Sequence, residues 1–177
     1  MSELLSPEQI IDGFKNKLVS DIIDTKIQTK SYGKTKKESI RIWIMVERKS
    51  FRKAIIHLKT LDFPHFLVCS GDDIGDNILI NYHFSIYYGK KLKEIPMIIR
   101  TTLPKNDLTI PTITDLIPSA TRSEREMQDM FGINVIGTPV DKPIFHPMYE
   151  LEGERFFPWR RDEKGAQEKH IKRLYER

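Results

Sequence analysis

Residues 40–46 spell Ile-Arg-Ile-Trp-Ile-Met-Val, and this stretch decides the fold class of the chain. Isoleucine or valine stands at every second position, so these side chains share one face of a strand while Arg41, Trp43 and Met45 share the other. Residues 78–86 repeat the alternation as Ile-Leu-Ile-Asn-Tyr-His-Phe-Ser-Ile. We therefore predict two strands here, each with one side in the core.

The rest of the N-terminal three-quarters of the chain predicts helices and further strands. Ser6-Pro7-Glu8-Gln9 combines a capping serine, a proline at the first helical position and a glutamine that closes a capping box. Apolar side chains follow at helical spacing over residues 10–18, and again over residues 51–58. Further strands are expected at 21–30, 66–69 and 93–102, and turns at 31–34 and 71–77. Pro96 is expected to place its strand at a sheet edge or to make it irregular.

This order of elements predicts an α+β fold: a mostly antiparallel sheet with helices packed on one face, followed by an extended C-terminal tail. We place the α+β domain at residues 1–132 and the tail at residues 133–177, which is rich in proline, with a basic helix expected near 166–175. The aromatic residues of the tail suit either binding to a partner chain or packing on their own domain. They are Phe145, Tyr149, Phe156, Phe157 and Trp159.

Composition narrows the class of protein further. Of the 177 residues, 39% are hydrophobic, which excludes wholesale disorder, and 31% are charged, which suits a heat-loving source. Cys69 is the single cysteine, so the chain forms no internal disulfide and cannot supply the four thiolates of an iron–sulfur cluster. Because Cys69 lies in an apolar run, we expect it to be a small buried hydrophobe.

The distribution of apolar and basic residues bears on membranes and nucleic acids. No apolar run approaches the ~20 residues that span a bilayer, and the start lacks the pattern of a secretory signal. We expect an intracellular chain that is soluble or held to a membrane through partners. The net charge of +4 is small and scattered, so the alternative of nucleic-acid binding through clusters of lysine is disfavoured.

Metal binding is the enzymatic alternative that the sequence leaves open. The five histidines never fall at the spacing of metal ligands such as His-x-x-x-His. Asp72, Asp73 and Asp76 have carboxylate oxygens that suit a cation, but the glycines among them favour an ordinary polar turn. No phosphate-binding glycine loop and no hydrolase nucleophile context is present in the sequence.

Residues 119–133, Ser-Ala-Thr-Arg-Ser-Glu-Arg-Glu-Met-Gln-Asp-Met-Phe-Gly-Ile, predict a short amphipathic helix. A capping box is available from Thr121 with Glu124 or from Ser123 with Glu126, and Gly132 suits the left-handed end of the helix. The apolar edge consists of Met127, Met130 and Phe131. Arg122 with Glu126, and Arg125 with Asp129, are spaced to pair on the surface. Taken alone, this pattern predicts a short amphipathic helix with one solvated face.

Within this helix, residues 124–133 (Glu-Arg-Glu-Met-Gln-Asp-Met-Phe-Gly-Ile) resemble the signature of the 30-kDa subunit family of respiratory complex I, the NADH-quinone oxidoreductase. The same family occurs in energy-converting [NiFe] hydrogenases and related ferredoxin-dependent membrane complexes. The resemblance covers roughly residues 40–137 and includes a lead-in at 111–120. Downstream, Gly137-Thr138-Pro139 and residues 157–162 depart from the respiratory-chain pattern, which favours the hydrogenase-like or sulfur-reducing branch over a true NADH–quinone complex.

The resemblance implies a scaffold without flavin, cluster or nickel. Iron–sulfur clusters, and in a hydrogenase NiFe, would belong to partner subunits, namely a chain like the [NiFe]-hydrogenase large subunit and a small cluster-bearing chain. It also implies a peripheral position at the cytoplasmic face of the cell membrane, with indirect attachment. The docking residues that it carries over are Glu124, Arg125, Glu126, Asp129, Met130, Phe131, Gly132 and Ile133.

Overall fold

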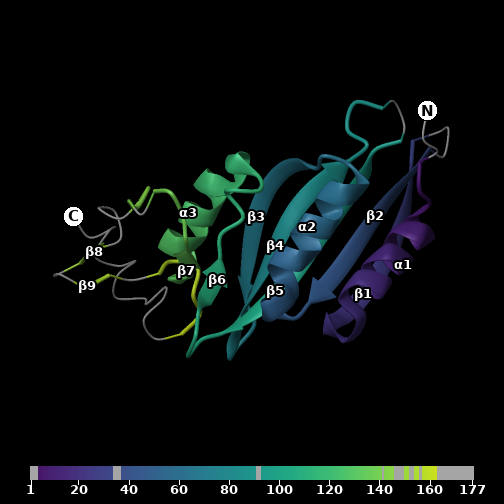
Figure 1. Ribbon diagram of the computed structural model, residues 1–177. Coiled ribbons are helices and arrows are strands. Elements are labelled where there is room, and N and C mark those ends of the chain that lie inside the picture. Colours follow the sequence, from purple (N-terminus) through teal and green to yellow (C-terminus); the bar gives the residue numbers. More distant parts are fainter. Residues whose placement is uncertain are drawn as a thin grey trace. The chain divides into compact units, whose positions relative to one another are not determined.

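The computed structural model describes most of the chain (Figure 1). The described residues are 4–33, 37–90, 93–140, 142–145, 150–151, 154–155 and 157–162. Among them, five strands form one sheet in the order β1-β2-β5-β4-β3. Their bounds are β1 Ile22–Tyr32, β2 Lys37–Val46, β3 His65–Asp73, β4 Asn77–Ile86 and β5 Ile95–Pro104. The sheet is mostly antiparallel, with β2 and β5 parallel, so the predicted α+β class is confirmed.

The chain divides into two compact units. Unit 1 contains residues 1–68 and 81–101, and unit 2 contains residues 69–80 and 102–177. The strands β3, β4 and β5 therefore contribute residues to both units. In the described part of the chain, the residues that follow Gly132 belong to the same unit as the helix before it. The domain boundary that the sequence places at this glycine stays a prediction.

Two helices cover one face of the strands of unit 1. They are α1, Pro7–Leu18, and α2, Phe51–Leu61, which lie side by side (Figure 1); α1 contacts β1 and β2, and Phe51 of α2 meets Tyr82 of β4. The capping box predicted at the start of α1 is confirmed, because Gln9 N donates to Ser6 Oγ and Ser6 N donates to Gln9 Oε1. The buried side chains of α1 and α2 share this core with the apolar side of β2. From β2 these are Ile42, Ile44 and Val46.

One of the two alternatives for Pro96, the sheet edge, is wrong, and so is the end of the strand expected at 66–69. Pro96 does not mark an edge, because β5 lies between β2 and β4. The ladder with β2 starts at Met97, so the missing N–H of Pro96 costs no hydrogen bond there. The strand expected at 66–69 continues to Asp73, which leaves only residues 74–76 for the turn before β4. Cys69 is buried, as predicted.

The described residues of unit 2 form one helix and four short strands, besides their shares of β3, β4 and β5. That helix is α3, Thr121–Phe131, preceded by a 3-10 turn at Pro118–Ala120. Short strands β6, Thr109–Pro111, and β7, Asn134–Ile136, pair in parallel, and β8, Glu150–Leu151, pairs with β9, Glu154–Arg155. Gly132 ends α3 in the left-handed conformation with φ 73°, as predicted.

The expected capping box at the start of α3 is absent from the structure. The N-cap position is Ala120, which has no capping side chain, and the Thr121 hydroxyl donates to Pro118 O instead. The basic helix expected near 166–175 lies outside the described residues, as do Tyr149 and Phe156. In the part of the chain that the structure describes, no helix combines the length and apolarity needed to cross a bilayer.

A pH dependence of stability follows from His57 on α2. Its ring meets Phe14 of α1 edge-on, and its Nε2 is buried with no hydrogen-bond partner among the described residues. Burial, helped by the charge of Lys17, holds the pKa of His57 below 6.5. The neutral form is therefore favoured in the folded state, and its contribution is full above the unfolded pKa and lost as the pH falls.

We expect the free energy of unfolding to fall between about pH 7.5 and about pH 5. His57→Gln should flatten this slope in urea titrations, whereas His65→Gln, at an exposed histidine of β3, should leave it as in the wild type. His83 shifts in the same direction and accounts for the slope that remains. An unchanged slope in His57→Gln would contradict the assignment.

Candidate docking site around the third helix

Glu124 is the most deeply placed charged side chain of α3, with no exposed surface. Its Oε2 accepts a hydrogen bond from Thr112 Oγ1 at 2.5 Å, and its Oε1 accepts one from Ile113 N at 2.9 Å. Thr112 and Thr114 are joined through their hydroxyls at 2.9 Å. A buried carboxylate is tolerated only when hydrogen bonds replace its lost water. Glu124 therefore holds the irregular segment before α3 against the helix.

One turn further along, Arg125 and Asp129 hold the segment that follows the helix. The Arg125 guanidinium donates to Lys142 O from Nε at 2.8 Å and from Nη2 at 2.5 Å. Asp129 Oδ2, on a side chain only 2% exposed, accepts from Ile144 N at 2.6 Å and from Phe145 N at 2.8 Å. These two side chains thus bind the backbone of residues 142–145.

The surface ion pairs predicted along α3 are not formed among the described residues. Arg125 turns to Lys142 O instead of Asp129, and Arg122 has no contact with Glu126. Backbone groups of residues 142–145 bind these charged side chains instead: the carbonyl of Lys142 accepts from Arg125, and two N–H groups donate to Asp129. Glu126 is partly exposed and Arg122 is exposed.

The apolar end of α3 packs closely on β3 within unit 2. The ring of Phe131, only 1% exposed, lies so near Gly71 that a Cβ on this glycine would come within 2.9 Å of Cζ and nearer still to Cε2. No real Cβ tolerates such a distance without displacement of the ring. Gly71 is therefore required by the close approach of the helix.

Residues 157–162, here called the return segment, enclose the C-terminal end of α3. A Cβ on Gly132 would lie 2.7 Å from the ring of Phe157, and Trp159 meets Phe131 edge-on with ring centroids 5.5 Å apart. Trp159 N donates to Met130 O at 3.2 Å, which satisfies a carbonyl of the last helical turn. Of the two roles considered for the tail aromatics, packing on the same unit is confirmed for Phe157 and Trp159. The indole of Trp159 remains 46% exposed.

A second buried carboxylate binds the return segment to β3. Asp73 Oδ2 accepts from Arg161 N at 2.7 Å and lies 2.7 Å from Lys105 Nζ, while Oδ1 accepts from Gly75 N at 3.2 Å. Burial alone would raise the pKa of Asp73, but Lys105 and the two N–H groups outweigh it and hold the pKa below 3.8. Asp73 is therefore ionised at neutral pH and serves as an acceptor for the chain itself, as a polar turn residue does.

The eight predicted docking residues fall into two groups. Those that are buried in unit 2 are Glu124, Asp129, Met130, Phe131 and Ile133. Those that are partly exposed are Arg125, Glu126 and Gly132. Their contact with another chain stays a prediction, while the observed contacts give most of them an internal role. The sequence places Gly71 in a turn and predicts neither its close packing against Phe131 nor the ion pair of Lys105 with Asp73.

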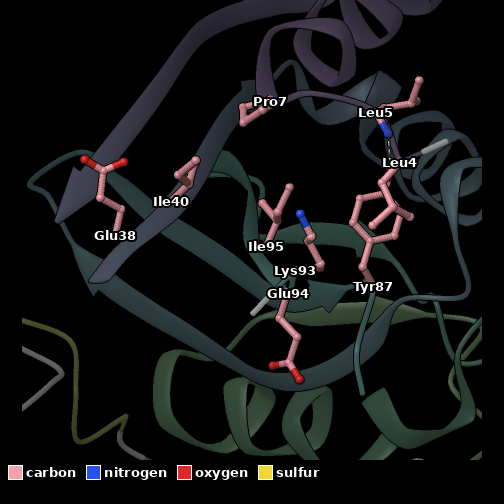
Figure 2. Close-up of a pocket in the computed structure, with 9 residues that line it drawn as sticks. All are labelled: Leu4, Leu5, Pro7, Glu38, Ile40, Tyr87, Lys93, Glu94 and Ile95. Carbon is pink, nitrogen blue, oxygen red and sulfur yellow. Dashed lines mark hydrogen bonds between the residues drawn. The ribbon is translucent and has the colours of Figure 1, made fainter. Parts of the chain in front are cut away.

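One pocket of unit 1 was not predicted, and its chemistry is modest. It has a volume of about 280 Å³ and is lined by the N-terminal segment, β2 and residues around the start of β5. Figure 2 shows the carboxylates of Glu38 and Glu94 pointing in different directions, so they do not form a catalytic pair. The Tyr87 hydroxyl accepts from Leu5 N at 3.3 Å, and Glu94 accepts from Gly89 N. In the described residues, no group of three His, Cys, Asp or Glu is placed to hold a metal ion.

These features define a class of protein: an α+β chain whose charged side chains mainly organise its own irregular segments. Residues 44–169 match the family described as respiratory-chain NADH dehydrogenase, 30 Kd subunit. The chain belongs to this family of oxidoreductase-complex subunits.

Individual relatives agree with this assignment. The chain is 27% identical over 133 residues to the membrane-bound hydrogenase subunit beta of Pyrococcus furiosus, covering 75% of each chain. It is 31% identical over 135 residues to NADH-quinone oxidoreductase subunit 5 of Thermus thermophilus, covering 68% of this chain and 60% of the relative. By their names, these relatives are subunits of larger complexes.

Solved structures show the same fold. A trypsin-resistant fragment of Nqo5 superposes with a TM-score of 0.51 at 26% identity, covering 64% of this chain and 89% of that one. A chain of the membrane-bound sulfane sulfur reductase, an archaeal respiratory membrane complex, gives a TM-score of 0.73 at 20% identity, covering 96% and 91%. The latter likeness, at that identity, is one of fold.

The close approach of α3 to β3 predicts the effect of Gly71→Ala. The added methyl group should destabilise the chain by about 1–3 kcal/mol, because the Phe131 ring cannot withdraw without losing its packing. The double variant Gly71→Ala/Phe131→Leu should recover part of this loss, which chemical denaturation measures. Equal stability of Gly71→Ala and wild type would contradict the contact.

The contacts of Asp73 predict how the return segment responds to Lys105→Ala. Loss of the ammonium leaves a buried carboxylate short of a partner at a cost of about 1–3 kcal/mol, so cleavage by trypsin after Arg160 or Arg161 should be roughly tenfold faster. Lys15→Ala, at an exposed lysine of α1, is the matched control. Mass spectrometry of timed digests gives the rates, and equal rates in both variants would show that Lys105 does not hold the segment.

Proposed function

We propose that this chain is a cofactor-free structural subunit of a membrane-bound, ion-translocating redox complex in the hydrogenase-like or sulfur-reducing branch of the complex I family. Its partners would be a chain like the [NiFe]-hydrogenase large subunit and a small cluster-bearing chain. The chain would lie at the cytoplasmic face of the membrane and attach through those partners. The match to the hydrogenase subunit beta over three-quarters of both chains supports this branch.

The single cysteine supports a role without redox centres of its own. Iron–sulfur clusters are usually held by four thiolates, and Cys69 is both alone and buried. Electron transfer through such a complex would then take place in partner chains. A rigid subunit that braces those chains would help to keep their cofactors at fixed distances.

The surface of α3 is the docking site that we propose, and Glu126 is the observation that carries the proposal. Glu124 and Asp129 are satisfied inside unit 2, but Glu126 has no ion pair or hydrogen bond among the described residues. Arg122, one turn earlier, is likewise exposed and unpaired there. Two unpaired charges on the helix that bears the family signature suit a partner of complementary charge. The buried members of the signature would hold this helix in place.

A second candidate is the equivalent subunit of a true NADH–quinone oxidoreductase. The 31% identity to NADH-quinone oxidoreductase subunit 5 favours it. The two candidates share the docking role and differ in the chemistry of the partners. Nickel in the purified complex, measured by plasma mass spectrometry, would support a hydrogenase; a flavin-containing NADH-oxidising module would support the alternative.

Glu126→Lys tests the docking helix in the assembled complex. Reversal of a charge that is paired across an interface should weaken binding by about 30-fold or more, so the subunit should be lost when the complex is purified through another chain. The isolated variant should melt like the wild type, because Glu126 has no described partner to lose. Arg125 is less suitable for this test, because its guanidinium donates to the carbonyl oxygen of Lys142 within the same chain.

Asp12→Lys is the control, because Asp12 is an exposed carboxylate on α1 and the change in charge is the same. It should leave both assembly and turnover as in the wild type. If Glu126→Lys also assembled and turned over normally, α3 would not be the docking helix.

A further inference from the structure

The strands of unit 1 have a second face, opposite the one that α1 and α2 cover. Residues directly opposite on paired strands point to the same side of a sheet. Trp43 of β2 is opposite Lys26 of β1 and Ile98 of β5, and Met45 is opposite Arg100. Trp43 alternates with the buried Ile42 and Ile44, so these residues lie on the side away from α1 and α2, where Trp43, Met45 and Arg100 are partly exposed and Ile98 is buried. We call it the open face.

Two arginines flank one tryptophan on the open face. The guanidinium carbon of Arg100 lies 5.2 Å from the centroid of the Trp43 ring, and that of Arg41 lies 5.9 Å from it. Arg100 Nε donates to Asn81 Oδ1 at 2.9 Å, which fixes the direction of this guanidinium. The indole and the amide thus hold the arginines before any ligand arrives. Such preorganisation reduces the entropy lost on binding.

The charge of the open face is positive and not balanced within the described residues. Neither Arg41 nor Arg100 has a carboxylate partner in the part of the chain that the structure describes. The exposed Lys26 adds a further positive charge, and Asp24, on β1 opposite Met45, is the carboxylate on this side.

The half-buried His83 of β4 lies in the electrostatic field of the same two arginines. Burial, together with the charges of Arg41 and Arg100, holds the pKa of His83 below 6.5. The neutral form of this histidine is therefore favoured beside the two arginines.

We propose that the open face is a second docking surface, and that its occupant is an acidic segment of another polypeptide of the complex. Carboxylates of that segment would accept hydrogen bonds from Arg41 and Arg100, and an apolar neighbour would pack against Trp43. Arginine and tryptophan are the residue types that contribute most to protein interfaces. Arginine also binds carboxylates through two parallel hydrogen bonds. This inference rests on the proposed docking function and adds a surface remote in sequence from α3.

A polypeptide fits this surface better than a nucleic acid does. Proteins that bind single strands on a sheet stack bases on exposed aromatic rings. Here the described indole, Trp43, already lies against two guanidinium groups, so a base would have to displace them. The same groups leave their outer N–H donors for carboxylates.

The double variant Arg41→Glu/Arg100→Glu tests the surface in the complete complex. We expect at least a tenfold loss of the subunit from complexes purified through another chain, and a smaller loss that depends less on salt in Arg41→Gln/Arg100→Gln. Lys15→Glu/Lys53→Glu changes the charge equally on the helix-covered side and should assemble as the wild type does. Normal assembly of Arg41→Glu/Arg100→Glu would overturn the proposal.

A crosslinking experiment keeps the test decisive if the reversed variant folds poorly. Trp43 is replaced by the photoreactive residue p-benzoylphenylalanine, and the complex is irradiated and digested. Crosslinks to a segment of another chain rich in Asp and Glu would support the proposal. Crosslinks to a neutral or basic segment, or no crosslinks at all, would overturn it. The same probe at the solvent-exposed Ile56 of α2 is the control.

Binding of a nucleic acid is tested with a fluorescein-labelled oligothymidylate. Salt-sensitive binding of this probe to the isolated chain, abolished by Arg41→Glu/Arg100→Glu, would replace the acidic polypeptide by a nucleic acid. Failure of this inference is distinguishable from failure of the docking function. If only the sheet variants assemble normally, the open face is excluded, whereas normal assembly of Glu126→Lys excludes the docking role of α3.

Discussion

Unit 2 depends on the need of irregular backbone for hydrogen-bond acceptors. A segment without helix or strand has N–H groups that no ladder satisfies, and each one left buried costs free energy. Three carboxylates meet this need. Glu124 accepts from Ile113 N, Asp129 accepts from two consecutive N–H groups at 144–145, and Asp73 accepts from Arg161 N. Short irregular segments around 113, 144–145 and 161 are therefore fixed by side-chain acceptors.

This constraint changes the meaning of the family signature. Charged residues on a short helix suggest a surface for a partner, yet Glu124 and Asp129 face inward and organise the chain on both sides of α3. Contact with another subunit would then fall to the residues that this internal scaffold leaves outside, such as Glu126 and Arg122. On the proposed function, neighbouring charged positions of α3 would divide two tasks, with the buried ones holding the fold and the exposed ones binding a partner.

The sequence predicts the parts of the fold that local patterns control. Alternation located β2 and β4, the capping box located α1, and Gly132 marked the end of α3. The sheet edge expected from Pro96 was wrong because a proline weakens a strand only where its N–H would enter a ladder. The sequence around Pro96 does not show which strands lie beside β5. The partners of Asp73 could not be foreseen either, since Lys105 and Arg161 are far away in sequence and carry no pattern that links them. Gly71 fits the same account, because its requirement arises from the ring of Phe131 across space.

The hydrogen bond between Arg161 N and Asp73 joins residues 88 positions apart, and this separation has a consequence for biogenesis. Asp73 leaves the ribosome long before its acceptor oxygens have a backbone donor from the return segment. During synthesis the carboxylate and the end of α3 must stay hydrated, so unit 2 matures only when the return segment has emerged. A nascent subunit therefore passes through a stage in which its helical signature is open to chaperones or to premature association.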